Sequence, residues 1–221
     1  MNTKLLSSVA TLLVLAGCAM MPTEEEVDRA TQEMMKSSFK DQGIAKVDRL
    51  NQDLAQQACS SEDGAAGIIR RTRGAVDEAK QIETQELKSI KWPADGRFLG
   101  DWMAGEKLAQ DGSGMTWRDK SAAPAENGGS CYNCHQISKE EISYGTIGPS
   151  LYNYGKLRGV TDPASPASKA VVEYTWGKLW NSKAYSACSN MPRFGHMKIL
   201  DENQLRDLMA LLLDPNSPVN Q

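Results

Sequence analysis

Apolar residues recur at helical spacing in two stretches of the N-terminal third of the chain. The first opens at Thr23, a capping residue followed by three glutamates, and the second follows a polar break at residues 59–64. The apolar positions of the first stretch are Val27, Ala30, Met34, Val47, Leu50 and Leu54, and those of the second include Ile69, Val76, Ala79, Ile82, Leu87 and Ile90. Each has one apolar and one charged face, so the pattern predicts a helical hairpin that serves as a packing extension or spacer.

A turn at residues 92–96, with the sequence Trp-Pro-Ala-Asp-Gly, predicts the start of a second unit. Within it the pattern predicts helices over residues 99–110 and 168–180, and a final helix capped by Asp201 and ended by Pro215. Residues 121–130 and 143–168 are expected to be loops. The predicted fold class is therefore all-α with long loops, and no repeat, low-complexity tract or GxGxxG motif interrupts it.

The N-terminus has the layout of a secretory signal peptide, with Lys4 before an apolar run over residues 5–15. The run ends in Leu15-Ala16-Gly17-Cys18, which resembles a bacterial lipobox. Residues 1–17 are thus expected to be removed and Cys18 to be acylated. Ordinary cleavage after Ala19 is the alternative, and either route places the product outside the cytoplasm.

Composition narrows the function classes. The 221 residues are 40% hydrophobic and 24% charged, with a net charge of -3 and a pI near 5.5, so a basic surface for nucleic acid is not expected. The only sustained apolar run, residues 5–15, is shorter than the roughly 18 residues that a membrane-spanning helix needs. The mature protein is therefore expected to be soluble, apart from a lipid anchor at Cys18.

The strongest chemical motif is Cys131-Tyr132-Asn133-Cys134-His135, a CxxCH sequence. Two thiols at this spacing can bond to the two vinyl groups of one haem c, and the adjacent histidine can bind the iron. A thioredoxin-like dithiol would need a βαβ setting, and a structural zinc site would need a second pair of ligands. Neither is found in the sequence, so covalent haem is the prediction.

A haem iron held by His135 has a sixth position that is either filled by the protein or open to small molecules. The candidate ligands are Met191, Met197, His196 and Cys188, although a methionine more often simply fills the core. Met191 is preferred because it opens a Met-Pro turn just before the last helix. A thioether there would close the iron and suit electron transfer.

Pro149 is the candidate hydrogen-bond partner of His135, because its carbonyl could accept a hydrogen bond from Nδ1–H and leave Nε2 for iron. A plain turn is the alternative. Four other side chains are candidates for haem packing or for the haem carboxylates, or else ordinary core and surface residues: Tyr152, Tyr154, Trp176 and Arg193.

Cys59 and Cys188 remain after these assignments. Because free thiols are a liability outside the cytoplasm, a Cys59–Cys188 disulfide is preferred. A persulfidated cysteine and an intermolecular bond remain as alternatives.

Taken together, the motifs resemble those of the SoxX family, the cytochrome subunits that pair with SoxA in thiosulfate oxidation. The resemblance covers most of the mature chain and rests on residues 92–102, Gly105-Glu106-Lys107, the CxxCH motif, residues 145–152 and 155–159, residues 191–195 and the leucine-rich last helix. The stretch around Cys59 looks like the extension of longer members, whereas a lipobox departs from the plain secretory signal expected of the family.

The resemblance implies a class I cytochrome c domain over residues 93–221, preceded by the helical extension over residues 18–92. It implies one low-spin haem on Cys131 and Cys134, with His135 and Met191 as axial ligands. It also implies a periplasmic heterodimer with a SoxA-like cytochrome, which couples thiosulfate to a cysteine of a SoxYZ-like carrier. This chain would be the electron-transfer subunit of that enzyme, passing electrons to a downstream acceptor.

Two other functions remain open at this point. One is a free-standing mono-haem electron carrier for another periplasmic redox chain. The other is an open-iron sensor or peroxidase, for which the sixth position would be vacant.

Overall fold

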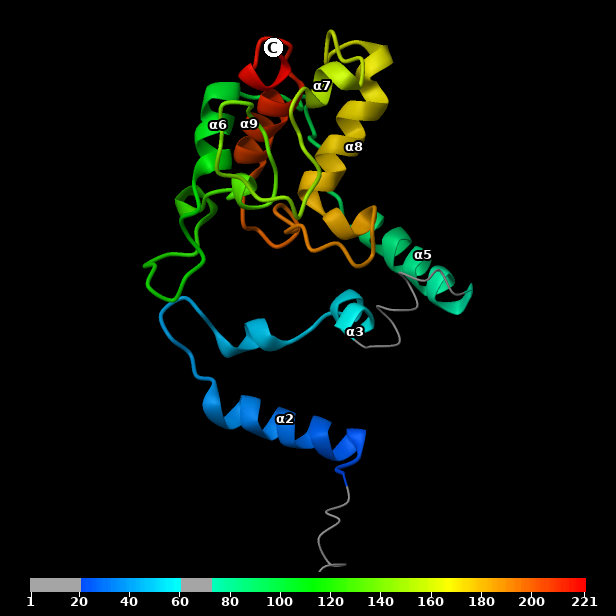
Figure 1. The fold of residues 1–221 in the computed structure, drawn as a ribbon, viewed down its shortest axis with the longest axis vertical. Coiled ribbons are helices and arrows are strands. Elements are labelled where there is room, and N and C mark those ends of the chain that lie inside the picture. The colour runs from blue at the N-terminus through cyan, green and yellow to red at the C-terminus, as the bar shows by residue number, and fades with distance from the viewer. Residues whose placement is uncertain (1–20, 61–72) are drawn as a thin grey trace, which may run out of the picture. The chain divides into compact units, whose positions relative to one another are not determined.

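The computed structural model describes residues 21–60 and 73–221 (Figure 1). The chain divides into two compact units, of which one ends at Asp41 and the other is Gln42–Gln221. The described residues form helices and loops without a named strand; the one β-bridge joins Gln42 and Ala45. The all-α prediction is confirmed. The lipobox with Cys18 lies outside the described residues, and so does Ile69 of the second amphipathic stretch.

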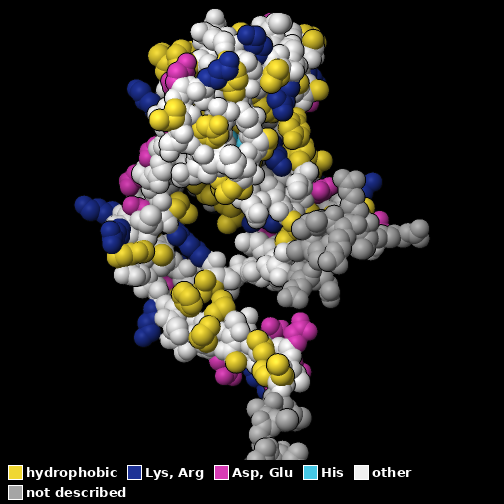
Figure 2. Space-filling view, in the orientation of Figure 1, with side chains coloured by type: hydrophobic (Ala, Val, Ile, Leu, Met, Phe, Trp, Pro, Cys, Tyr) yellow, Lys and Arg dark blue, Asp and Glu magenta, His cyan; other side chains and the backbone are white. Residues whose placement is uncertain are grey.

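Helix α2, Glu24–Ser38, belongs to the first unit, and it starts where the sequence predicts. Thr23 and Glu26 form a capping box, in which each side chain accepts a hydrogen bond from the other residue's backbone N–H. No residue of α2 is buried, and Figure 2 shows apolar side chains on the surface of this segment, Val27, Met34 and Phe39 being about half exposed. Among the described residues of this unit, 21–41, the apolar face of α2 is therefore not buried.

The first amphipathic stretch is not one helix up to Leu54, and that part of the prediction is wrong. After Phe39 the chain turns at Gly43, whose φ of +55° is in the left-handed region. A 3₁₀ turn, Val47–Leu50, and the short helix α3, Leu54–Ser60, follow in the second unit. The first stretch is therefore divided between the two units, with Glu24–Ser38 in the first and Val47–Leu50 and α3 in the second.

Helix α5, Arg73–Lys88, belongs to the second unit together with all that follows. Trp176 Nε1 donates a 2.8 Å hydrogen bond to the carbonyl of Lys91, and Asn181 Nδ2 donates one of 2.6 Å to Glu86 Oε2. Ile90 joins the main hydrophobic core. Residues 42–60 and 73–92 thus belong to the same compact unit as the predicted haem domain, so the expected boundary at 92/93 does not coincide with the boundary between the units.

Helices α6, Trp102–Gln110, and α9, Glu202–Leu213, pack closely against each other in this unit (Figure 1). Asp101 caps α6, and Asp201 with Gln204 forms a capping box at α9. A side chain at Gly105 would overlap the backbone of Asp207. Glycine is therefore needed where the two helices meet.

Helix α9 also contacts two further helices. Helix α8, Lys169–Trp180, contributes Trp176 and Trp180, which stack with ring centroids 6.0 Å apart. The predicted loop over residues 143–168 contains a short helix α7, Tyr154–Leu157. Further 3₁₀ turns are Pro124–Glu126, Cys131–Asn133, Pro166–Ser168, Ser182–Ala184 and Pro218–Asn220. In the parts of the chain that the structure describes, no helix has the length and apolar character to cross a bilayer.

Candidate functional site

A cavity of about 530 Å³ lies between the CxxCH segment, α7, α8, α9 and the loop before α9. Its volume is within the range of about 300–1,000 Å³ that is typical of sites for small molecules and cofactors. The lining is mostly apolar, with Leu208, Leu211 and Leu212 from α9 and Leu179 from α8 among its residues.

The CxxCH segment presents both thiols and the histidine to this cavity. Ser130 adopts a left-handed φ of 52°, and the 3₁₀ turn Cys131–Asn133 follows it. The carbonyl of Cys131 accepts hydrogen bonds from the backbone N–H groups of Cys134 and His135, at 3.1 and 2.9 Å. This tight turn places Cys131, Cys134 and His135 on the wall of one cavity.

Both motif cysteines carry free thiols in the structure. Burial is the main cause that raises the pKa of Cys131, to about 12, and the nearby Cys134 raises it further. At neutral pH Cys131 is therefore a protonated thiol. A reactive dithiol of the thioredoxin type requires the opposite, a lowered pKa.

His135 contacts Pro149, the partner predicted from the sequence. Its Nδ1 lies 2.7 Å from the carbonyl oxygen of Pro149, which can only accept, so Nδ1 carries the proton. The N–H of Gly148 donates to the carbonyl of Cys134 at 2.8 Å, and a side chain at Gly148 would overlap the imidazole ring. Pro149 thus fixes the tautomer and leaves Nε2 as a free ligand atom, as expected of an iron-binding histidine.

Of the four candidates for the sixth ligand, Met191 is the one that lines the cavity. Cys188 is joined to Cys59 in a disulfide, Met197 is 53% exposed, and His196 directs Nδ1 at Ser89 Oγ, 3.1 Å away. The backbone of Met191 is fixed on both sides, because its carbonyl accepts from Ser182 Oγ at 2.5 Å and its N–H donates to Ser189 Oγ at 3.2 Å. The structure therefore places one thioether beside the two thiols and the imidazole.

The four packing candidates separate into one cavity residue and three others. Tyr154 lines the cavity and shares a 3.0 Å hydrogen bond with Thr175 Oγ1. Tyr152 donates to the carbonyl of Gln221, Trp176 donates to that of Lys91, and Arg193 pairs with Asp53, all outside the cavity lining. These three are therefore committed to structural contacts.

Two cationic side chains that sequence reasoning missed also line the cavity, Arg158 and Lys178. The Arg158 guanidinium carbon lies 3.7 Å from the centroid of the Tyr154 ring, and its Nη1 donates to the Tyr154 carbonyl at 3.1 Å. Burial lowers the pKa of Lys178, and nearby Glu83 counteracts this in part. A ligand with carboxylate groups could pair with such cations.

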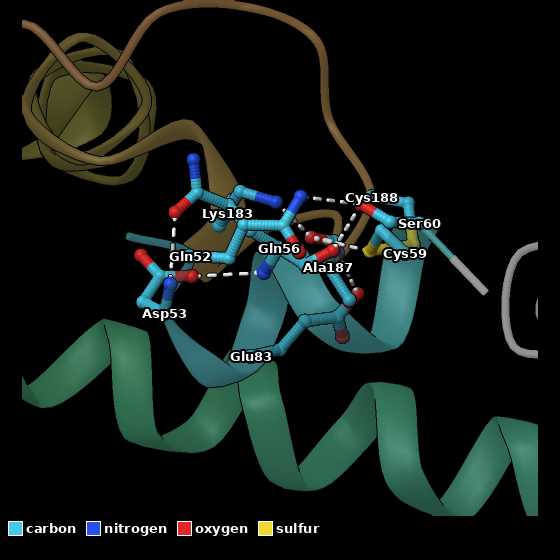
Figure 3. Close-up of a disulfide and its surroundings, with 9 residues drawn as sticks. All are labelled: Gln52, Asp53, Gln56, Cys59, Ser60, Glu83, Lys183, Ala187 and Cys188. Carbon is cyan, nitrogen blue, oxygen red and sulfur yellow. Dashed lines mark hydrogen bonds between the residues drawn. A yellow bond between two sulfur atoms is a disulfide. The ribbon is translucent and has the colours of Figure 1, made fainter. Parts of the chain in front are cut away.

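The disulfide between Cys59 and Cys188 is present, with Cα atoms 5.4 Å apart (Figure 3). It connects α3 to the loop that carries Met191, three residues further along the chain. The pairing is the one preferred from the cysteine count.

The residues that line the cavity fit a covalently attached haem. They provide the two thiols of the CxxCH motif, an imidazole whose Nε2 is free, a thioether and an apolar wall. Within residues 21–60 and 73–221, no group of three or more His, Cys, Asp and Glu side chains is arranged to hold a metal ion. A haem iron with one histidine and one methionine ligand needs only one imidazole and one thioether from the protein. His135 and Met191 can supply these two groups.

No family model matches the chain. It is 33% identical over 211 residues to an uncharacterized lipoprotein of Aquifex aeolicus (strain VF5), an alignment that covers 93% of this chain and 90% of the relative. The chain belongs to the same family as that protein.

Proposed function

We propose that this chain is a mono-haem c-type cytochrome that transfers electrons. The observation that carries the proposal is the convergence of Cys131, Cys134, His135 and Met191 on one mostly apolar cavity. Each thiol would add its S–H across one vinyl group to form a thioether, a step that needs no external oxidant. A bound haem c would supply an iron that exchanges one electron at a time.

The protein's own residues favour electron exchange over chemistry at the iron. The Pro149 carbonyl accepts a hydrogen bond from Nδ1–H of His135, so the imidazole keeps one orientation and one tautomer. Met191 is fixed at its backbone, and its thioether would supply a sulfur ligand to a bound haem, which would leave no open site for oxygen or peroxide. The apolar wall excludes water, which favours a raised reduction potential.

Met191→Ala tests this assignment, with Met197→Ala as the matched control because Met197 is exposed and outside the cavity lining. We expect the ferric parent and M197A to show the weak near-infrared charge-transfer band of sulfur-ligated iron, and M191A to lose it. The reduction potential of M191A should fall, and its ferrous form should bind carbon monoxide rapidly. A parent that lacks the band and binds carbon monoxide would instead support an open-iron sensor or peroxidase.

The narrower proposal is that the chain is the SoxX-like subunit of a SoxAX-type L-cysteine S-thiosulfotransferase. It is supported by the combination of residues 92–102, 145–152, 155–159 and 191–195 with the CxxCH motif. Its partners would be a SoxA-like cytochrome, a SoxYZ-like carrier and a downstream electron acceptor. The sulfur chemistry would rest on the SoxA-like partner, and this chain would take up the electrons.

Co-purification from the native source tests that narrower proposal. We expect the chain to elute with a second cytochrome, and the pair, but not this chain alone, to join thiosulfate to the carrier cysteine. A chain that elutes alone yet exchanges electrons with another redox protein would be a free-standing carrier. Coupling by the isolated chain would contradict the proposed division of labour.

We also propose that Cys18 carries a lipid anchor and that the haem domain lies in the periplasm. The lipobox-like sequence ending at Cys18 and the description of the relative as a lipoprotein support this. The full-length chain is expected in the membrane fraction and to incorporate labelled fatty acid, and Cys18→Ser should abolish the labelling. Labelling that persists in C18S would contradict the anchor.

A further inference from the structure

The loop that carries Met191 has two faces with different surroundings. Met191, Pro192 and Phe194 line the cavity, whereas Arg193, between them, does not. Arg193 is nevertheless buried, with its side chain 6% exposed. A buried guanidinium needs charged partners, since an unpaired charge in the interior is costly.

The partners of Arg193 come from the segment that the sequence indicated as a mere extension. Nη2 of Arg193 lies 2.5 Å from Asp53 Oδ2, and Nη1 lies 3.6 Å from Glu86 Oε1. Burial alone would raise the pKa of Asp53, but the N–H of Gln56 and the Arg193 guanidinium outweigh it and lower that pKa. Asp53 is therefore ionised at neutral pH and forms an ion pair with Arg193.

Other contacts from the same segment reach the same loop. Glu83 Oε1 accepts from the backbone N–H of Ala187 at 3.1 Å, and the Cys59–Cys188 disulfide lies close to this contact (Figure 3). Glu86 Oε2 accepts from Asn181 Nδ2 at 2.6 Å, and Ser89 Oγ lies 3.1 Å from His196 Nδ1. The contacts span residues 181–196 and so enclose Met191 on both sides along the chain.

We propose that this segment is a clamp on residues 181–196, which we call the methionine loop, and that Arg193 is the positioning residue through which the clamp acts. The clamp consists of Asp53, Cys59, Glu83, Glu86 and Ser89. It holds residues 181–196 so that the Met191 thioether stays on the cavity wall. The clamp would thereby keep the Met191 sulfur on a haem iron, and this part rests on the proposed function. The ordering of the loop by the clamp is independent of that function.

The test compares two Asp→Asn variants in the full-length, haem-loaded protein. Asp53→Asn removes the charge that faces Arg193 but keeps an N-cap for α3, where Asp53 Oδ1 now accepts from the N–H of Gln56. The matched control is Asp95→Asn, which removes an ion pair of another arginine, Arg206, at 2.8 Å. Arg193→Lys is the second variant, because lysine keeps the charge but lacks the fork that reaches two carboxylates.

Two measurements are read on each variant. We expect amide hydrogen exchange of residues 184–192 to accelerate by about tenfold or more in D53N and R193K, with little change in α9 and little change anywhere in this loop for D95N. The sulfur-to-iron band should weaken, and carbon monoxide should bind the ferrous form faster, in the same two variants only. Equal exchange of the loop in D53N, R193K and D95N would overturn the proposal.

The two measurements also separate this proposal from the function it builds on. A parent without the sulfur-to-iron band would contradict the His135/Met191 cytochrome, while faster exchange in D53N and R193K would still support the clamp. A parent with the band that D53N and R193K leave unchanged would overturn the positioning role and leave the cytochrome intact.

Discussion

Replacing both Cys131 and Cys134 by alanine is expected to abolish covalent attachment of haem. Thioether bonds need free thiols at the cavity, and the structure offers these two, because Cys59 and Cys188 are joined to each other. The measurement is haem staining after denaturing electrophoresis, in which only covalently bound haem stays with the chain. The parent should stain, the double variant should not, and each single variant should retain one bond and stain weakly.

Asn133→Ala is the control for this prediction. Asn133 lies inside the motif and is exposed, and its side chain bonds to Ser130 Oγ at 2.5 Å, so its removal disturbs the turn without touching a thiol. N133A should stain as strongly as the parent. Full staining of the double variant, or none of the parent, would refute covalent haem.

The sequence predicted the fold best where one local pattern contains all the information. The helices at the two ends of the predicted haem domain follow from their apolar spacing and, for the last one, from capping by Asp201, and the structure has them as α6 and α9. The prediction failed after Phe39, where the turn at Gly43 ends the helical pattern. Apolar spacing continues through Val47 to Leu54, so periodicity alone could not reveal the interruption.

The same distinction explains the site. CxxCH and the Met-Pro turn are contiguous motifs, and the Pro149 carbonyl follows His135 after a short loop, so each could be read from the sequence. Arg158 and Lys178 reach the cavity only through the packing of α7 and α8. Tyr174 also lines the cavity, and its spacing of four from Lys178 puts both on one face of a helix, which is the one available signal for Lys178.

The role of residues 42–92 was the hardest feature to predict. Their acidic side chains look like an ordinary solvated helix face, and only the tertiary structure shows three of them, Asp53, Glu83 and Glu86, directed at the methionine loop. From the sequence, Arg193 was a candidate partner for a haem carboxylate. In the structure it is buried and pairs with two carboxylates of the protein itself. Ion pairs between residues far apart in the chain leave no periodic pattern in the sequence, so they could not be predicted from it.

Removing the Cys59–Cys188 disulfide is expected to lower the free energy of unfolding by about 2–5 kcal/mol. The bridge joins residues 129 positions apart, so the unfolded chain gains considerable conformational freedom when it is absent. Cys59→Ser with Cys188→Ser makes the change, and urea unfolding of the haem-loaded protein measures it. Because Cys188 precedes Met191 by three residues, the double variant should also show faster hydrogen exchange in that loop.

Reduction of the parent provides an internal control for the disulfide prediction. Tris(carboxyethyl)phosphine should shift the parent's unfolding curve toward that of the double variant and leave the double variant unchanged, and any effect of the reductant on the haem is common to both. Thiol titration of the denatured, haem-loaded parent without reductant should find neither Cys59 nor Cys188 reactive. Two reactive thiols, or equal unfolding midpoints in parent and double variant, would show that the bridge does not hold α3 to the methionine loop in solution.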